Sequence, residues 1–238
     1  EGDKSKVQFH VHYPTSIEDM FLTTAETFIP IEKINAHKER CNALAVKDNV
    51  NIPKYGYFEP LFDYNRPMGE NSDLPFYVLG TQFIPTEGVD DPQTTCVIIK
   101  HPVENWKNRY FQGTDPVASE SGHSKMASAV WDSYLNMPVA LVNFRVQEYK
   151  YCYQQTWLLG LYYDSIQPRN LIEANVGSGY IDYVEGKGYL KSLVTTKMIA
   201  PYLKTSSSGR FGIRKTSANA RFLWHKLREV LESYSENI

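Results

Sequence analysis

Cysteine is scarce in this sequence, and its pattern argues against two kinds of cross-linked domain. The 238 residues contain three cysteines, Cys41, Cys96 and Cys152. They are odd in number and far apart, so they predict neither a disulfide framework nor the paired spacing of a zinc site. We interpret them as reduced, mostly buried side chains of a cytosolic protein. A hydrophobic content of 42% is enough to build a core without such cross-links.

The sequence also lacks a membrane segment and a P-loop. No run resembles a signal peptide or a membrane span. At Gly186-Lys187 the spacing from Gly179 is wrong for a P-loop, and Gly188 stands where that motif needs Ser or Thr. This excludes an intact P-loop ATPase. We interpret Gly177 and Gly179 instead as residues that let the backbone turn sharply.

Acidic residues are missing from a long stretch near the C-terminus. Between Gly186 and Arg228 there is no Asp or Glu, whereas Lys and Arg together occur ten times. The overall net charge of −2 hides this asymmetry. A stretch of one sign predicts a surface for a polyanion, and the alternative is a solvated face that happens to lack acids.

The rest of the sequence is organised around the stretch from Asn108 to Glu173. Alternation and helical spacing predict five elements in order: a strand ending in Asp115, strands over 125–133 and 139–147, a helix over 148–164, and a strand ending in Glu173. If the first three strands form an antiparallel meander, the helix can return the last strand parallel to the first. Asp115 and Glu173 would then lie side by side at the carboxyl edge of the sheet.

Two converging carboxylates predict a site for Mg²⁺ or Mn²⁺, because these cations prefer oxygen ligands. The alternative for Asp115 is a turn residue before Pro116, and for Glu173 a surface acid at the end of a strand. The apolar residues Leu171 and Ile172 precede Glu173. A charged side chain without a partner is uncommon directly after such apolar residues.

The flanking segments predict further elements of an α/β protein. Upstream we expect a short strand over 7–11, a helix from Pro30, and a β-rich stretch over 50–105 in which Pro and Gly recur. Downstream we expect helices from Tyr180 to Glu185 and from about Ser217.

Four short motifs follow one another along the chain: Tyr13-Pro-Thr-Ser-Ile-Glu-Asp-Met-Phe21, Gly113-Thr-Asp-Pro116, Leu171-Ile-Glu-Ala-Asn-Val-Gly-Ser-Gly179 and Phe211-Gly-Ile-Arg-Lys-Thr216. In this order they resemble the large terminase subunit of tailed phages, with its C-terminal ribonuclease-H-like nuclease domain. The resemblance implies a mixed central sheet flanked by helices, with an N-terminal β-rich appendage. It divides the chain into residues 1–50, which close a preceding ATPase domain, a β-rich insertion or added sheet over 51–105, and a nuclease domain over 106–238.

By resemblance, the protein would cut concatemeric double-stranded DNA with two divalent cations, Mg²⁺ or Mn²⁺. Asp115 would bridge both cations and Glu173 would hold one. The expected DNA-binding residues are basic ones from the acid-free stretch: Lys187, Lys197, Arg210, Arg214 and Lys215. The family also needs a third acid on a helix beyond this region, and we expect it past Ile238, with Asp182 as the nearest spare acid.

The resemblance also implies partners and a place of action. The expected partners are the ATPase domain of the same full-length protein, the portal protein and the small terminase subunit, with no membrane. The expected location is the cytoplasm of an infected bacterium, at the procapsid portal. Two alternatives stay open: a non-catalytic DNA-binding or assembly module of the same fold, and another ribonuclease-H-like nuclease of the resolvase or transposase type. The segment at Tyr13-Pro14 favours a terminase over the latter.

Overall fold

The chain divides into two compact units, Glu1–Val50 with Ala220–Ile238, and Asn51–Asn219. The computed structural model describes residues 53–69, 74–106, 108–117, 125–146, 148–163, 169–175, 178–202 and 210–214, and more sparsely 35–36, 39, 43, 216, 219–223, 225–226 and 229. The described residues of the first unit are helical, and Lys226 forms an exposed ion pair of 2.6 Å with Glu229. The strand predicted over 7–11 lies outside the described residues.

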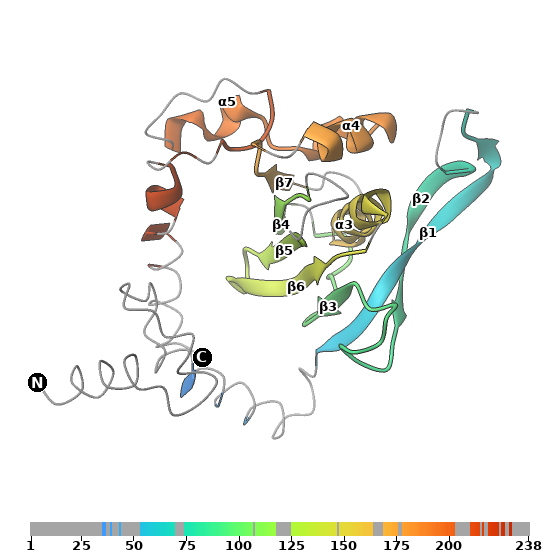
Figure 1. Cartoon of the computed structure of the whole chain (residues 1–238), viewed down its shortest axis with the longest axis horizontal. Coiled ribbons are helices and arrows are strands. Elements are labelled where there is room, and N and C mark those ends of the chain that lie inside the picture. The colour runs from blue at the N-terminus through green and yellow to red at the C-terminus, as the bar shows by residue number, and fades with distance from the viewer. Residues whose placement is uncertain are drawn as a thin grey trace, which may run out of the picture. The chain divides into compact units, whose positions relative to one another are not determined.

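Seven strands of the second unit form one mixed sheet in the order β2-β1-β3-β6-β5-β4-β7 (Figure 1). Their bounds are β1 Lys54–Pro67, β2 Phe76–Pro85, β3 Cys96–Ile98, β4 Tyr110–Asp115, β5 Met126–Asp132, β6 Met137–Phe144 and β7 Arg169–Ile172. All neighbours pair antiparallel except β4 and β7, which are parallel. The predicted meander with a parallel return is therefore confirmed, and the fold is mixed α/β.

The helices follow the central strands. They are α3 Tyr149–Tyr163, α4 Ser178–Gly186 and α5 Thr196–Ile199, with short 3-10 turns η2 Leu190–Ser192 and η3 Ala200–Tyr202. The crossover helix α3 lies where a helix over 148–164 was predicted, and it is buried on almost every side. No helix among the described residues is long and apolar enough to cross a membrane.

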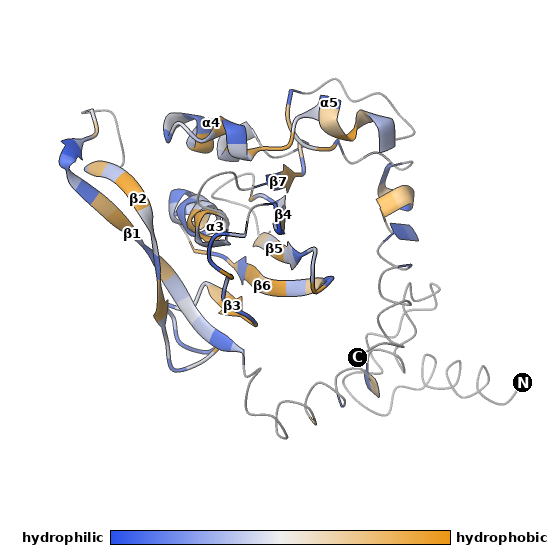
Figure 2. Ribbon diagram, turned by 180° about the vertical axis from the view of Figure 1, so that it is seen from behind, coloured by the Kyte–Doolittle hydropathy of each residue, from blue (hydrophilic) through white to orange (hydrophobic). Residues whose placement is uncertain are grey.

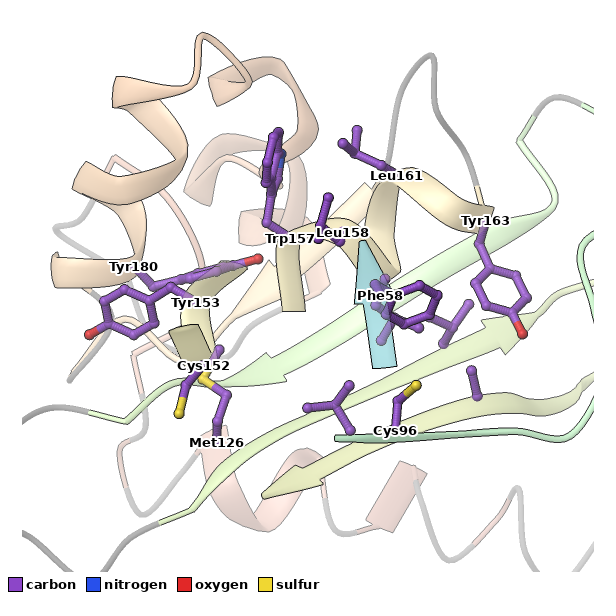
Figure 3. Close-up of a cluster of buried hydrophobic side chains, with 14 of the residues drawn as sticks. Phe58, Cys96, Met126, Cys152, Tyr153, Trp157, Leu158, Leu161, Tyr163 and Tyr180 are labelled. Atoms are coloured by element: carbon purple, nitrogen blue, oxygen red, sulfur yellow. The ribbon is translucent and has the colours of Figure 1, made fainter. Parts of the chain in front are cut away.

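The core lies between α3 and one face of the sheet (Figure 3). Met126 of β5 and Cys152 and Leu158 of α3 are completely buried there. In Figure 2, β6 is orange over much of its length, whereas α3 carries both hydrophobic and hydrophilic residues. On the other face of the sheet, Phe111 and Leu141 are 37% and 40% exposed. The sheet is therefore packed on the α3 side and open on the side of Phe111.

The segment predicted as a β-rich insertion contributes β1, β2 and β3 to this same sheet. Strand β1 pairs with β3 over three residues only, whereas it pairs with β2 along most of its length, so β1 and β2 form a two-stranded ribbon. Gln155 of α3 holds the ribbon through both backbone groups of Phe58, at 2.8 Å each. The contacts group residues 51–219 in one unit, while the domain boundaries predicted at 50 and 105 stay predictions.

Candidate functional site

The structure places Asp115 and Glu173 next to one another at one edge of the sheet. Asp115 is the last residue of β4, and Glu173 follows β7 directly. Thr114 pairs with Ile172 in the parallel ladder, and the N–H of Glu173 donates to the carbonyl of Thr114 at 2.9 Å. Asp115 and Glu173 thus lie side by side, one position beyond the Thr114–Ile172 pair. Adjacent strands in a sheet lie about 4.8 Å apart.

Both acids project from the open face of the sheet. Side chains alternate along β4, with Gln112 and Thr114 buried and Gly113 and Asp115 exposed. The same alternation along β7 buries Ile172 and leaves Glu173 half-buried. Because both carboxylates can reach solvent and carry only oxygen donors, the pair fits a hard divalent cation.

A third segment, residues 211–213, continues this edge beyond β7. Ile213 bridges Glu173 in parallel, its N–H donates to the carbonyl of Ile172, and its carbonyl accepts from Ala174, both at 2.8 Å. The exposed Arg214 follows directly. A basic residue, Arg214, therefore lies at the sheet edge that carries Asp115 and Glu173.

Gly212 allows this third segment to approach β7. Its φ is +71°, and a Cβ built on it would lie 2.6 Å from Cγ1 of Ile172 and closer still to the Ile172 carbonyl oxygen. Gly188 has a similar φ of +77° but no atom within 4 Å of its Cβ position. Comparing substitutions at Gly212 and Gly188 therefore separates the effect of backbone conformation from the effect of close packing.

We expect Gly212→Ala to destabilise the protein by about 1–3 kcal/mol more than Gly188→Ala, because only the first forces atoms together. Both variants carry the strain of a left-handed residue, about 1–2 kcal/mol. Urea denaturation of the two variants measures the difference. Equal losses of stability would contradict the close approach of residues 211–213 to β7.

A buried hydrogen-bond network lies beneath the acids, on the α3 side of the sheet. Gln112 Nε2 donates to Ser128 Oγ at 2.9 Å, and Ser128 Oγ lies 3.0 Å from Thr114 Oγ1. Thr114 Oγ1 donates to Asn170 Oδ1 at 2.8 Å, and Asn170 Nδ2 donates to the Tyr180 hydroxyl at 3.2 Å. The network links β5, β4, β7 and α4 in turn, so it fixes the register in which Asp115 and Glu173 meet.

We expect Asn170→Leu to lower the free energy of unfolding by about 2–3 kcal/mol, because the buried hydroxyls of Tyr180 and Thr114 lose their hydrogen bonds to Asn170. Asn143→Leu is the matched control, because Asn143 lies exposed on β6. There we expect a change within about 0.5 kcal/mol. Chemical denaturation of both variants tests this, and similar values for the two would argue against a structural role for the network.

The expected DNA-binding residues differ in their exposure. Lys187 is only 6% exposed, with its ammonium 5.0 Å from the centre of the Tyr183 ring, so it is a poor candidate for contacting DNA. The side chains of Lys197, Arg210 and Arg214 are exposed. Lys215 lies outside the described residues.

The three exposed basic residues come from neighbouring segments. The N–H of Thr196 donates to the carbonyl of Arg210 at 3.2 Å, so the helix that carries Lys197 lies beside Arg210. Arg210 places its guanidinium 4.9 Å from the centre of the Phe211 ring. The chain then continues through Ile213 to Arg214, at the sheet edge that carries Asp115 and Glu173.

Asp115 and Glu173 form a pair rather than a complete cluster in the described part of the chain. No group of three or more His, Cys, Asp and Glu side chains suited to a metal occurs among the described residues. Asp182 is exposed on α4 and does not complete such a group with the two acids. The third acid implied by the resemblance stays a prediction.

Gly179 has a different role from the sharp turn predicted for it. Among the described glycines only Gly188 and Gly212 have positive φ, so Gly179 does not turn the chain in that way. Instead, a Cβ on Gly179 would lie 2.8 Å from the hydroxyl oxygen of Tyr153. Gly179 therefore lies at a close approach between α4 and the Tyr153 side chain of α3. Gly177 lies outside the described residues.

Comparison with known proteins adds no assignment to this geometry. No protein-family model and no curated protein matches this sequence.

Proposed function

We propose that this chain is the nuclease module of a terminase large subunit: a metal-dependent endonuclease of ribonuclease-H-like fold that cuts double-stranded DNA. One observation carries the proposal. A meander of three strands and a helical crossover return β7 parallel to β4, and this brings Asp115 and Glu173 together at an exposed sheet edge. The motifs at Gly113–Pro116 and Leu171–Gly179, through which the chain resembles the family, are the segments that meet there.

The two carboxylates supply two of the ligands that the proposed chemistry needs. Asp115 would contact both of two divalent cations and Glu173 one of them. Such cations activate the attacking water and stabilise the leaving oxygen in phosphodiester hydrolysis. Because two neighbouring carboxylates repel one another, a bound cation also stabilises the ionised pair.

The charges beside the sheet edge that carries Asp115 and Glu173 support DNA as the substrate class. Arg214 leaves the sheet at this edge, and Arg210 and Lys197 lie along the segments that lead to it. Exposed Lys and Arg side chains bind a DNA backbone through its phosphates, independently of base sequence. A concatemeric DNA substrate, an ATPase domain in the same full-length protein, and the portal and small terminase subunit as partners rest on the resemblance.

Cleavage of supercoiled plasmid in Mn²⁺ or Mg²⁺ by the full-length protein, which by resemblance also carries the third acid, tests the proposal. We expect nicked and linear products that disappear with a chelator and with Glu173→Gln, but persist with Asp90→Asn. Asp90 is the matched control, because it is an exposed acid in the loop between β2 and β3. Absence of metal-dependent cleavage, with DNA binding intact, would favour the non-catalytic DNA-binding module instead.

DNA binding is tested separately from cutting with Arg210→Ala and Arg214→Ala combined. We expect this double variant to bind DNA less tightly and to reduce the dependence of log affinity on log salt concentration by about two, one for each lost phosphate contact. An unchanged salt dependence would show that these two arginines do not contact the DNA.

A further inference from the structure

Tyr153 of α3 contacts the segment that follows Asp115. Its side chain is 2% exposed, and its hydroxyl donates a 2.8 Å hydrogen bond to the carbonyl oxygen of Val117. Val117 lies two residues after Asp115 and is 1% exposed, as part of a short buried segment with Pro116. The chain is thus held by α3 as soon as it leaves the candidate metal-binding strand.

The same hydroxyl lies close to the segment that follows Glu173. Gly179 lies in the first turn of α4, the helix that comes after Glu173. A Cβ there would be 2.8 Å from the Tyr153 hydroxyl oxygen, but 3.5 and 3.6 Å from Cε2 and Cζ of the ring. A methyl group at this position would therefore press on the hydroxyl and not on the ring.

The ring of Tyr153 is held in place by other aromatic side chains. Tyr149, Tyr180 and Tyr183 surround it, with ring centroids at 5.3, 5.5 and 5.9 Å. Figure 3 shows Tyr153 and Tyr180 beside one another at one end of the core. Burial raises the pKa of the Tyr153 hydroxyl, so it remains a hydrogen-bond donor at neutral pH.

We propose that Tyr153 is a positioning residue for the acid pair: its hydroxyl joins the segment after Asp115 to the segment after Glu173 and so sets how the two carboxylates face one another. This inference rests on the proposed function, because the separation of the carboxylates matters only if they share a bound cation. Groups that hydrogen-bond directly to metal ligands typically change metal affinity by about 10- to 100-fold, and for Tyr153, which acts through the backbone, we expect the lower end of that range. The role needs no contact between Tyr153 and the metal or the DNA.

A double-mutant cycle of Tyr153→Phe and Gly179→Ala tests the proposal, with Mn²⁺ affinity measured by electron paramagnetic resonance. We expect Tyr153→Phe to weaken Mn²⁺ binding by about tenfold, since the bond to Val117 is lost. Gly179→Ala should weaken it in the wild-type background, because the new methyl group pushes against the hydroxyl. In the Tyr153→Phe background the same change should have little further effect, because the nearest remaining ring atoms are at ordinary contact distance.

Tyr149→Phe is the control, because Tyr149 lies one turn away on α3 and in the same aromatic cluster. It should bind Mn²⁺ like the wild type. Thermal melts identify any variant that fails to fold, and if Tyr153→Phe does so, Gly179→Ala alone decides the question. Wild-type Mn²⁺ affinity in Tyr153→Phe or in a folded Gly179→Ala variant, or equal effects of Gly179→Ala in both backgrounds, would overturn the positioning role. Failure of the unmutated chain to bind Mn²⁺ would overturn the proposed metal centre, and this inference with it.

Discussion

Replacing Asp115 with asparagine is expected to reduce Mn²⁺ affinity and metal-dependent DNA cleavage by more than about a hundredfold, while the protein stays folded. Even residues that only support a metal ligand typically cost 10- to 100-fold in affinity or activity, and Asp115 is proposed as a ligand itself. The fold should tolerate the change, because Asp115 is exposed at the end of β4 and asparagine has the same shape. Mn²⁺ titration, plasmid cleavage and a thermal melt measure the three quantities.

The effects of the two acids should differ in size. Because Asp115 is expected to contact both cations and Glu173 only one, Asp115→Asn should be at least as damaging as Glu173→Gln. Asp90→Asn should leave all three quantities unchanged. Cleavage that persists at the wild-type rate in Asp115→Asn would rule out this residue as a ligand.

The largest expected effect on stability lies at the opposite end of β4, where Arg109 and Asp132, the last residue of β5, form a buried ion pair. They are 6% and 1% exposed. Nε of Arg109 donates to both carboxylate oxygens at 2.9 Å, and Nη2 donates to Oδ2 at 2.7 Å. Oδ1 also accepts from the N–H groups of Tyr134 and Leu135 at 2.9 and 3.1 Å. The ring of Trp106 lies 4.4 Å from the guanidinium carbon.

We expect Asp132→Ala to lower the free energy of unfolding by about 3–5 kcal/mol, because it leaves the Arg109 guanidinium buried without its counter-charge. Urea denaturation measures the loss, with Asp90→Ala as an exposed control that should change stability by less than about 0.5 kcal/mol. A loss below about 1 kcal/mol for Asp132→Ala would show that Arg109 finds solvent or another partner.

The same pair should make stability depend on pH. Burial opposes ionisation of Asp132, but the hydrogen bonds from Arg109 and from the N–H groups of Leu135 and Tyr134 outweigh it and lower the pKa of the carboxyl. The folded pKa is then below the unfolded value of about 3.9, so the contribution is complete above that value and is lost as the pH falls through the folded pKa. Asp132→Asn should therefore lose less stability than the wild type as the pH falls below about 4.

Local patterns in the sequence were enough to predict the centre of the sheet. Alternation along Tyr110–Asp115 and Met126–Asp132 and the helical spacing of Tyr149–Tyr163 are short-range signals, and each marks an element that the structure contains. The parallel pairing of β4 with β7 followed from their order. These signals were also enough to predict that Asp115 and Glu173 lie at the same edge of the sheet. What the two acids bind stays a prediction.

Contacts between distant segments could not be predicted in this way. The joining of β1 to β3, and the bonds between Gln155 and Phe58, depend on how the sheet curls around α3. A count of charges likewise could not distinguish the buried Lys187 from the exposed Arg214.

The buried polar residues gave a signal that could have been used. In β4, Gln112 and Thr114 occupy the same alternating positions as the apolar Tyr110, so they point to the same face. Polar side chains on a core face predict a hydrogen-bond network, because buried polar groups need partners. Their partners, such as Asn170, could not be named without knowing the pairing of β4 with β7.

The most direct measurement of the central claim is a Mn²⁺ titration of the unmutated chain and of the double variant Asp115→Asn with Glu173→Gln, followed by electron paramagnetic resonance. We expect saturable Mn²⁺ binding by the unmutated chain, and its loss in a double variant that melts as the wild type does. Binding of equal strength by both proteins, or by neither, would contradict a metal centre at this edge of the sheet.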